Sequence, residues 1–234
     1  MYFNKNQGKF QMTIISLFSG AGGLDLGLIQ AGNDVIWAND IDADAVATYK
    51  ANINDHIIQA DIQNIDITKV PSADVVVGGF PCQGFSMANM KRNIDDERNV
   101  LYKFFYNAIK EKQPKFFIAE NVKGILSLGK GSVVKQIKAD FEGAGYIVEV
   151  HKVNMADYGV PQHRERVLFI GQRKDLGTKM IFDFPNPTNS KDGKGGLPRW
   201  KSIKEAIDDL PPIGNTDNDP NNYGSAYRFV ARNF

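Results

Sequence analysis

The chain has 234 residues, 42% of them hydrophobic, and a formal net charge of +1 at pH 7, which is typical of a globular protein with one sizeable core. No apolar run approaches the roughly 20 residues of a membrane helix, and the N-terminal segment lacks a signal-peptide core. The single cysteine, Cys82, excludes an internal disulfide, so we expect a cytoplasmic, reducing environment. A nucleic-acid partner would need a local basic patch on so neutral a chain.

Short apolar segments alternate with helix-like segments along most of the chain. This alternation predicts an α/β fold with a doubly wound, mostly parallel sheet, in which ligands bind at the carboxyl ends of the strands. In chain order we expect a strand at 13–18, a helix at 23–32 with Leu24, Leu28 and Ile29 on one face, a strand at 34–38, a helix at 42–52, strands at 56–60 and 73–79, a helix at 100–112, a strand at 115–120, a helix at 132–145 and a closing pair of strands at 146–154 and 166–172.

The composition changes near residue 174, where Pro, Gly, Asn and Asp become frequent and only one short helix-like stretch interrupts them. Such a composition is typical of loops rather than of another strand–helix repeat of the fold. We therefore expect one domain at residues 1–173 and a loop-rich extension at 174–234.

The first three predicted strands end in residues that suit a nucleoside. The segment "LFSGAGGLDLG" (17–27) places glycines between a strand and a helix N-terminus, where backbone can approach a ligand. Asp40 follows the second strand and Asp61 with Ile62 the third; an acid can accept from ribose hydroxyls or an adenine amino group. Each feature alone also fits a tight turn or a helix cap. The glycine spacing departs from G-x-G-x-x-G, which disfavours a nicotinamide cofactor.

Cys82 stands in "GGFPCQGFS" (79–87), just beyond the fourth predicted strand. A lone cysteine is more often an inert buried residue. Its place in a glycine- and proline-rich loop at a strand end instead favours a nucleophile, which would need positive potential nearby to form the thiolate.

Two further segments suggest polar chemistry at the same edge of the sheet. Glu120 in "AENVKG" ends the fifth predicted strand; desolvation there would favour the protonated carboxyl and a general-acid role, although a helix-capping acid is the alternative. Asn121 could brace a neighbouring loop. Arg164 and Arg166 alternate in "QHRER" and point the same way in extended chain, which suits a base carbonyl, a phosphate or a thiolate, or only a solvated basic edge.

The segments "FSGAGGLDLG", "GGFPCQGFS", "ENVKG" and "QHRER", in this order, resemble the cytosine-5 methyltransferases that modify DNA, and the resemblance runs from about residue 13 to 171. Amino-methyltransferases use a different proline-rich tetrad and no cysteine. The resemblance implies the Rossmann-like fold of S-adenosylmethionine-dependent methyltransferases, with residues 1–173 as the catalytic domain. It also implies methyl transfer to C5 of a flipped-out cytosine in double-stranded DNA, S-adenosylhomocysteine as product, no metal, and a bacterial restriction–modification context.

The resemblance also implies roles for individual residues. Cys82 would attack C6 of the base, and Glu120 would be the acid at N3. Arg166 would donate a hydrogen bond to O2, and Arg164 would position the thiol and the base. Asp40 stands where the family usually has glutamate. The implied cofactor residues are Phe18, Gly20, Gly22, Gly23, Leu24, Asp40, Ile41, Asp61, Ile62, Pro81 and Leu101. The implied DNA-binding residues, mostly on a mobile loop at 86–98, are Gln83, Ser86, Lys91, Arg92, Arg98 and Gln162.

The last two conserved segments of single-chain members are not found, and the sequence stops where a target-recognition region would start. We therefore expect either a truncated chain or one subunit of a split enzyme, with a second polypeptide that carries the missing part. Three alternatives stay open: a tRNA cytosine-5 methyltransferase, a non-catalytic regulatory partner of an active subunit, and a plain nucleotide-binding module.

Overall fold

The computed structural model describes residues 11–81 and 100–209. The chain divides into two compact units, Met1–Asn154 with Arg164–Asn186, and Met155–His163 with Pro187–Phe234. Each is described by itself below. The first unit thus includes residues that follow the predicted domain boundary at residue 173, and the assignment of catalysis to residues 1–173 stays a prediction.

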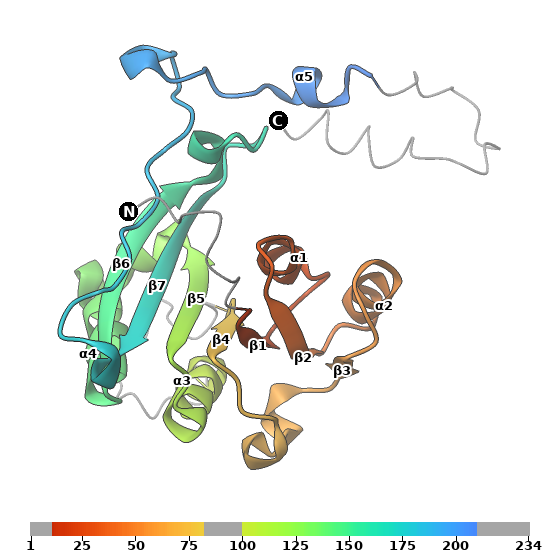
Figure 1. Cartoon of the computed structure of the whole chain (residues 1–234), viewed down its shortest axis with the longest axis vertical. Coiled ribbons are helices and arrows are strands. Elements are labelled where there is room, and N and C mark those ends of the chain that lie inside the picture. The colour runs from red at the N-terminus through yellow and green to blue at the C-terminus, as the bar shows by residue number, and fades with distance from the viewer. Residues whose placement is uncertain (1–10, 82–99, 210–234) are drawn as a thin grey trace. The chain divides into compact units, whose positions relative to one another are not determined.

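The first unit contains a seven-stranded sheet with the order β3-β2-β1-β4-β5-β7-β6 (Figure 1). Each neighbouring pair from β3 to β5 is parallel, and β7 runs antiparallel to both β5 and β6. The predicted α/β fold with a mostly parallel sheet is confirmed. The strands are β1 (Thr13–Leu17), β2 (Asp34–Asp40), β3 (Ile57–Gln59), β4 (Val75–Gly78), β5 (Phe116–Val122), β6 (Tyr146–Asn154) and β7 (Glu165–Arg173).

Among the described residues, four α-helices belong to this unit and a fifth to the other. They are α1 (Gly23–Gln30), α2 (Ala43–Asn52), α3 (Val100–Lys112), α4 (Ser132–Gly143) and, in the second unit, α5 (Ile203–Ile207). The expected elements are all present, with ends that differ by a few residues. One difference matters for the site: β5 continues to Val122, because Glu120, Asn121 and Val122 pair with Leu168, Val167 and Arg166 of β7.

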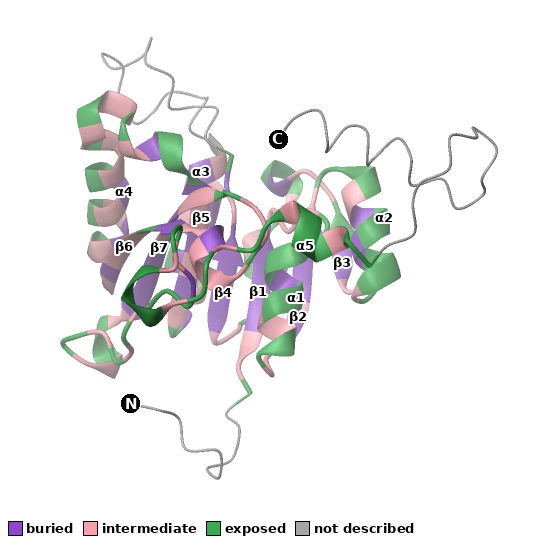
Figure 2. Cartoon of the chain, turned by 90° about the horizontal axis from the view of Figure 1, so that it is seen from above, coloured by how far each residue is buried: buried purple, intermediate pink, exposed green. Residues whose placement is uncertain are grey.

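Both faces of the sheet are buried, which is why its central strands read as continuous apolar runs. Ile14 of β1 belongs to a cluster with Val75 and Val77, against which Leu28 and Ile29 of α1 pack. Ile15 and Leu17 point the other way, into a larger cluster that includes residues of α3 and α4. Figure 2 shows the buried residues concentrated on the strands and the exposed residues on the outer faces of the helices.

The larger cluster is dominated by aromatic rings. Phe117 of β5 lies with its ring centroid 4.4 Å from that of Phe141 of α4 and 5.2 Å from that of Tyr146 of β6. A Cβ atom on Gly171 of β7 would overlap the Phe117 ring. The small residue in β7 thus makes room for the ring, and close packing of this kind fixes β7 against β5.

A carboxylate joins the amino ends of three strands. Asp74, directly before β4, accepts hydrogen bonds from the backbone N–H (3.0 Å) and the hydroxyl (3.1 Å) of Thr13 in β1. Its other oxygen lies 2.8 Å from Nζ of Lys115, directly before β5. The Lys115 hydrogen bond, followed by the Thr13 backbone bond, lowers the pKa of Asp74. The ionised carboxylate therefore stabilises the folded chain.

Replacing Asp74 by asparagine is expected to lower the free energy of unfolding by about 1–2 kcal/mol at neutral pH. Because the folded pKa lies below the unfolded one, the stabilisation is present above the unfolded value near 3.9 and is lost as the pH falls through the folded value. Urea unfolding near pH 7 and near pH 3 checks this: the difference between the two proteins should shrink in acid. An equal difference at both pH values would show that the charge is not responsible. Asp175→Asn, which removes an exposed pair with Arg173, is the control and should have the smaller effect.

The second unit brings two separate segments together. The backbone carbonyl of Asp157 accepts hydrogen bonds from the N–H groups of Thr188 and Asn189, and its side chain accepts one from the Trp200 indole at 2.9 Å. Ser202 and Glu205 form a reciprocal capping box at the start of α5. Within the described ranges of the chain, no helix is both long enough and apolar enough to cross a membrane.

Candidate cofactor and catalytic site

A pocket of about 190 Å³ opens where β1, β4 and β5 end. These strands are parallel neighbours, so their carboxyl ends meet at one edge of the sheet. Of the predicted site residues, Phe18, Leu24 and Glu120 line the pocket. The full lining is Ser16, Leu17, Phe18, Ser19, Leu24, Asp25, Gly78, Gly79 and Glu120.

The glycine-rich turn between β1 and α1 adopts left-handed backbone. Phe18, Gly20 and Gly22 have φ values of 55°, 56° and 89°, and Gly22 is the N-cap of α1 without a side-chain cap. A Cβ atom on Gly22 would lie 2.7 Å from Cδ2 of Tyr49, so the turn can pack against α2 only with glycine there. Gly23 begins α1 itself. The turn thus leads into the N-terminus of α1, where the first backbone N–H groups of a helix have no partner within the helix and can bind a ligand.

Asp40 ends β2 and holds the turn from the side. One carboxylate oxygen accepts the N–H of Gly20 at 2.7 Å, and the other accepts the N–H of Asp42 at 2.9 Å. A carboxylate has about four acceptor positions, so these two bonds leave capacity for ribose hydroxyls. The next residue, Ile41, is 64% exposed. The role of both residues toward a cofactor stays a prediction.

Asp61 follows β3 and caps a short 3₁₀ turn, where it accepts the N–H of Gln63 at 3.0 Å. Ile62 is only 5% exposed and belongs to the main core cluster. Its side chain therefore packs mostly against the protein. Leu101 is partly buried against the same cluster, and Pro81 is exposed. Their contacts with a cofactor likewise stay predictions.

Three of the four predicted catalytic residues lie together. Oε1 of Glu120 is 2.7 Å from Nε of Arg166 and 4.0 Å from Nη2 of Arg164. The antiparallel register pairs Val122 with Arg166, which makes Glu120 and Arg166 diagonal neighbours on one face of the sheet. A Cβ atom on Gly79 would come within 3.2 Å of the Glu120 carboxylate, so the glycine leaves room for that group.

The Glu120–Arg166 pair is close but incompletely hydrogen-bonded. Nη1 of Arg166 donates to the backbone carbonyl of Glu165 at 2.8 Å. Its Nε atom is buried, and its N–H direction meets no acceptor with hydrogen-bond geometry in the described residues, despite the short ion-pair distance to Glu120. A buried donor without an acceptor costs free energy, so a ligand atom that accepts a hydrogen bond from it would bind favourably here.

Asn121 fixes the segment that leads to Cys82. Its side chain is buried and donates to the carbonyl of Phe80 at 2.9 Å, while its own oxygen accepts the N–H of Val122 at 2.8 Å. Phe80 is buried with its ring centroid 5.3 Å from that of Tyr102. The predicted brace is therefore confirmed, and it ties β5 to the chain two residues before the predicted nucleophile.

The roles of the remaining predicted residues stay predictions. Cys82, together with Gln83, Ser86, Lys91, Arg92 and Arg98, lies outside the described residues. Gln162 belongs to the second unit, where its N–H donates to the carbonyl of Val160 at 2.8 Å.

Comparison with known proteins identifies the family. A family model described as C-5 cytosine-specific DNA methylase matches residues 12–231. The chain belongs to the C-5 cytosine-specific DNA methylase family.

Relatives of the same family share extensive sequence with the chain. It is 44% identical over 212 residues to the Type II methyltransferase M.NgoFVII of Neisseria gonorrhoeae, covering 89% of this chain and 56% of that protein. It is 41% identical over 231 residues to the Type II methyltransferase M.BspRI of Lysinibacillus sphaericus, covering 86% and 53%. A crystal structure of an E. coli prophage protein named as a DNA modification methyltransferase matches with a TM-score of 0.66 and 34% identity, covering 87% and 56%. The chain spans about half the length of the curated relatives it matches.

One buried group in this C-5 methylase chain was missed by sequence reasoning. Asp25 is fully buried in α1, whereas Leu24, predicted to share one helical face with Leu28 and Ile29, is 40% exposed. The burial of Asp25 becomes possible because the hydroxyls of Ser16 and Tyr49 donate to its two oxygens, at 2.6 and 2.9 Å. The only signal in the sequence is an acid inside an otherwise apolar helix segment.

A metal site is not found among the described residues: no three His, Cys, Asp or Glu side chains there are grouped to hold an ion.

Proposed function

We propose that the chain supplies the cofactor-binding and catalytic part of a DNA (cytosine-5) methyltransferase of the restriction–modification type. Membership of the C-5 methylase family and the names of the Type II relatives support this assignment. The observation that carries it is the Glu120–Arg166 pair beside the pocket at the strand ends, next to the braced segment that precedes Cys82.

The pocket and its rim suit S-adenosylmethionine, which would supply an electrophilic methyl group. At about 190 Å³ the pocket is smaller than the roughly 300 Å³ of the smallest typical ligand sites, so we propose that it holds only part of the cofactor. Leu17, Phe18 and Leu24 provide apolar wall, and Ser16 and Ser19 provide hydroxyls. The carboxylate of Asp40 and the N-terminus of α1 would then hold the ribose and the remaining polar groups.

The Glu120–Arg166 pair matches one edge of cytosine. N3 and O2 are adjacent acceptors on the base, and the carboxyl and guanidinium groups lie side by side on β5 and β7. In the proposed complex Glu120 gives a hydrogen bond or proton to N3, and the buried Nε–H of Arg166 gains O2 as its acceptor. The base thus replaces the contact that the two side chains make with each other.

In the proposed reaction these groups act in successive steps. C5 of cytosine is a weak nucleophile, so the Cys82 thiolate adds to C6 and moves electron density to C5, while Glu120 neutralises the charge that develops at N3. C5 takes the methyl group. Loss of the C5 proton and elimination of Cys82 then restore the ring. A stacked base cannot be reached in this way, so the target cytosine is flipped out of the duplex.

The test is covalent trapping on duplexes that carry 5-fluorocytosine within randomised flanking sequence, with S-adenosylmethionine present. Fluorine at C5 prevents the final elimination, so the protein is expected to stay bonded to DNA through denaturing electrophoresis. The assay is run with the chain alone and with the part of a relative that it does not cover. Absence of an adduct in both, with the cofactor bound, would contradict the proposal. A preference for 5-fluorocytidine RNA would assign the chain to RNA methylation instead.

A further inference from the structure

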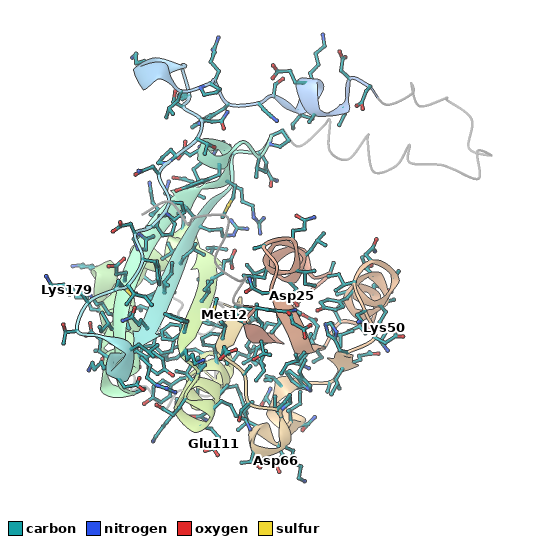
Figure 3. All side chains as sticks on the ribbon, viewed as in Figure 1. Met12, Asp25, Lys50, Asp66, Glu111 and Lys179 are labelled. Carbon is teal, nitrogen blue, oxygen red and sulfur yellow. The ribbon has the colours of Figure 1, made fainter. Side chains whose placement is uncertain are left out.

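A buried carboxylate stands behind one wall of the pocket. Asp25 has no exposed surface and lies in the first turn of α1, on the side that faces β1 (Figure 3). It lines the pocket with Ser16 and Ser19. In the part of the chain that the structure describes, no lysine or arginine pairs with it, and the basic group that acts on it is His56, through Tyr49.

The hydrogen bonds of this carboxylate have a defined direction. An ionised carboxylate can only accept hydrogen bonds, so Ser16 donates its single hydroxyl hydrogen to Asp25 at 2.6 Å. The Ser16 oxygen can then only accept, and the hydroxyl of Ser19 donates toward it at 2.9 Å, with the Ser16 carbonyl at 3.1 Å as its second acceptor. Ser19 has no further hydrogen to offer. The hydroxyl wall of the pocket therefore presents only acceptor positions to a ligand.

Tyr49 and His56, on the other side of the carboxylate, do not neutralise its charge. Tyr49 donates to Asp25 at 2.9 Å, so its oxygen accepts from Nε2 of His56 at 2.8 Å. Burial lowers the pKa of His56, which favours the neutral ring at neutral pH. Burial also raises the pKa of Asp25, against the Ser16 and Tyr49 hydrogen bonds. The negative charge of Asp25 is therefore under-compensated within the protein, and a positive charge in the pocket would stabilise it.

From this arrangement we infer that Asp25, acting through Ser16 and Ser19, makes the pocket select a cationic ligand over a neutral one of the same shape. Resting on the proposed function, the inference assigns Asp25 as the residue that favours the sulfonium of S-adenosylmethionine over the uncharged thioether of S-adenosylhomocysteine. The two molecules share their ammonium and carboxylate groups and differ in charge by one unit at sulfur. Because Asp25 is fully buried, its charge can act on a ligand in the pocket without direct contact. Asp25 is thus a specificity-determining residue that also favours product release.

Isothermal titration of both molecules into the wild-type chain and Asp25→Asn tests the inference. Asparagine keeps the size of the side chain but removes its charge. We expect the affinity for S-adenosylmethionine to fall about tenfold, with the affinity for S-adenosylhomocysteine changed by less than about twofold. Equal losses for both molecules would overturn the inference, because they would show a merely structural role.

Two further variants keep the test decisive if Asp25→Asn fails to fold. Ser19→Ala removes the last acceptor of the relay at a partly exposed position and should reduce the affinity ratio about threefold; an unchanged ratio would contradict the inference. Tyr49→Phe keeps the carboxylate but removes one donor that offsets its charge, so the preference for the cationic molecule should not fall; a fall as large as in Asp25→Asn would contradict the inference. Asp44→Asn, an exposed acid in the first turn of α2, is the matched control and should change neither.

The outcomes also separate the inference from the proposed function. If the wild-type chain binds neither molecule, the proposed function fails. If it binds both and forms the 5-fluorocytosine adduct, while Asp25→Asn leaves the affinity ratio unchanged, only the role of Asp25 fails.

Discussion

Replacing Cys82 by alanine is expected to abolish both the covalent adduct with 5-fluorocytosine DNA and methyl transfer to unmodified DNA. The chain has no other cysteine, so no second thiol can add to C6. Without that addition, C5 keeps the low nucleophilicity of the free base, and the remaining groups can bind but not activate it. The measurements are adduct formation in denaturing gels and transfer of labelled methyl groups to DNA.

Binding experiments separate this chemical loss from a loss of fold. Cys82→Ala should titrate S-adenosylmethionine as the wild type does and unfold at the same temperature within about 2 °C, since the substitution removes one sulfur atom. Cys82→Ser keeps a hydroxyl but should also form no adduct, because an unactivated hydroxyl is a far weaker nucleophile than a thiolate. If Cys82→Ala still formed an adduct, another residue would have to be the nucleophile, and the proposed mechanism would be wrong.

Replacing Glu120 by glutamine is expected to lower the rate of methyl transfer by about 10²–10⁴-fold. Glutamine fits the site left open by Gly79, but it has no carboxyl proton to give to N3 and cannot neutralise Arg166. The affinity for S-adenosylmethionine should stay within about threefold, because glutamine keeps the size of the side chain in the pocket wall and loses only the acid proposed to act on the base. Single-turnover methylation with saturating cofactor measures the chemical step alone.

Glu165→Gln is the matched control for Glu120. Glu165 lies on β7 and pairs with Lys123 at 2.5 Å and Lys152 at 3.2 Å, so it carries a paired carboxylate without a place in the proposed chemistry. Its substitution should leave the single-turnover rate within about threefold of wild type. Equal losses in the two variants would show that general surface charge, and not a group at N3, sets the rate.

Much of the fold was predictable because its signals are local. The central strands are buried on both faces and therefore read as apolar runs such as Val75–Gly78. Glycines stand where the turn before α1 needs left-handed backbone, as at Gly20 and Gly22. Glu120 and Arg166 could be assigned to one site because each stands near an end of a predicted strand, and their 2.7 Å contact agrees with that assignment.

Other features depended on partners distant in sequence. The continuation of β5 to Val122 results from pairing with β7, which no pattern within residues 115–120 can indicate. Leu24 was expected to share one helical face with Leu28 and Ile29, yet the fully buried residue of α1 is Asp25, because Ser16 and Tyr49 satisfy its oxygens. Such compensation involves residues 9 and 24 positions away, so helical periodicity alone ranks the acid as exposed.

The sequence by itself predicted the order of strands and helices along the chain, the family, and a set of candidate reactive groups, because periodicity, glycine positions and short motifs are properties of neighbouring residues. Only the tertiary structure decided which side chains are in contact. These contacts are the ion pair between Glu120 of β5 and Arg166 of β7, the hydrogen bond from Asn121 to Phe80, and the hydrogen bond from Ser16 to the buried carboxylate of Asp25. The physical reason is that a buried charge or donor is tolerated only where folding brings it a partner, and that partner is chosen by strand order and packing rather than by adjacent sequence.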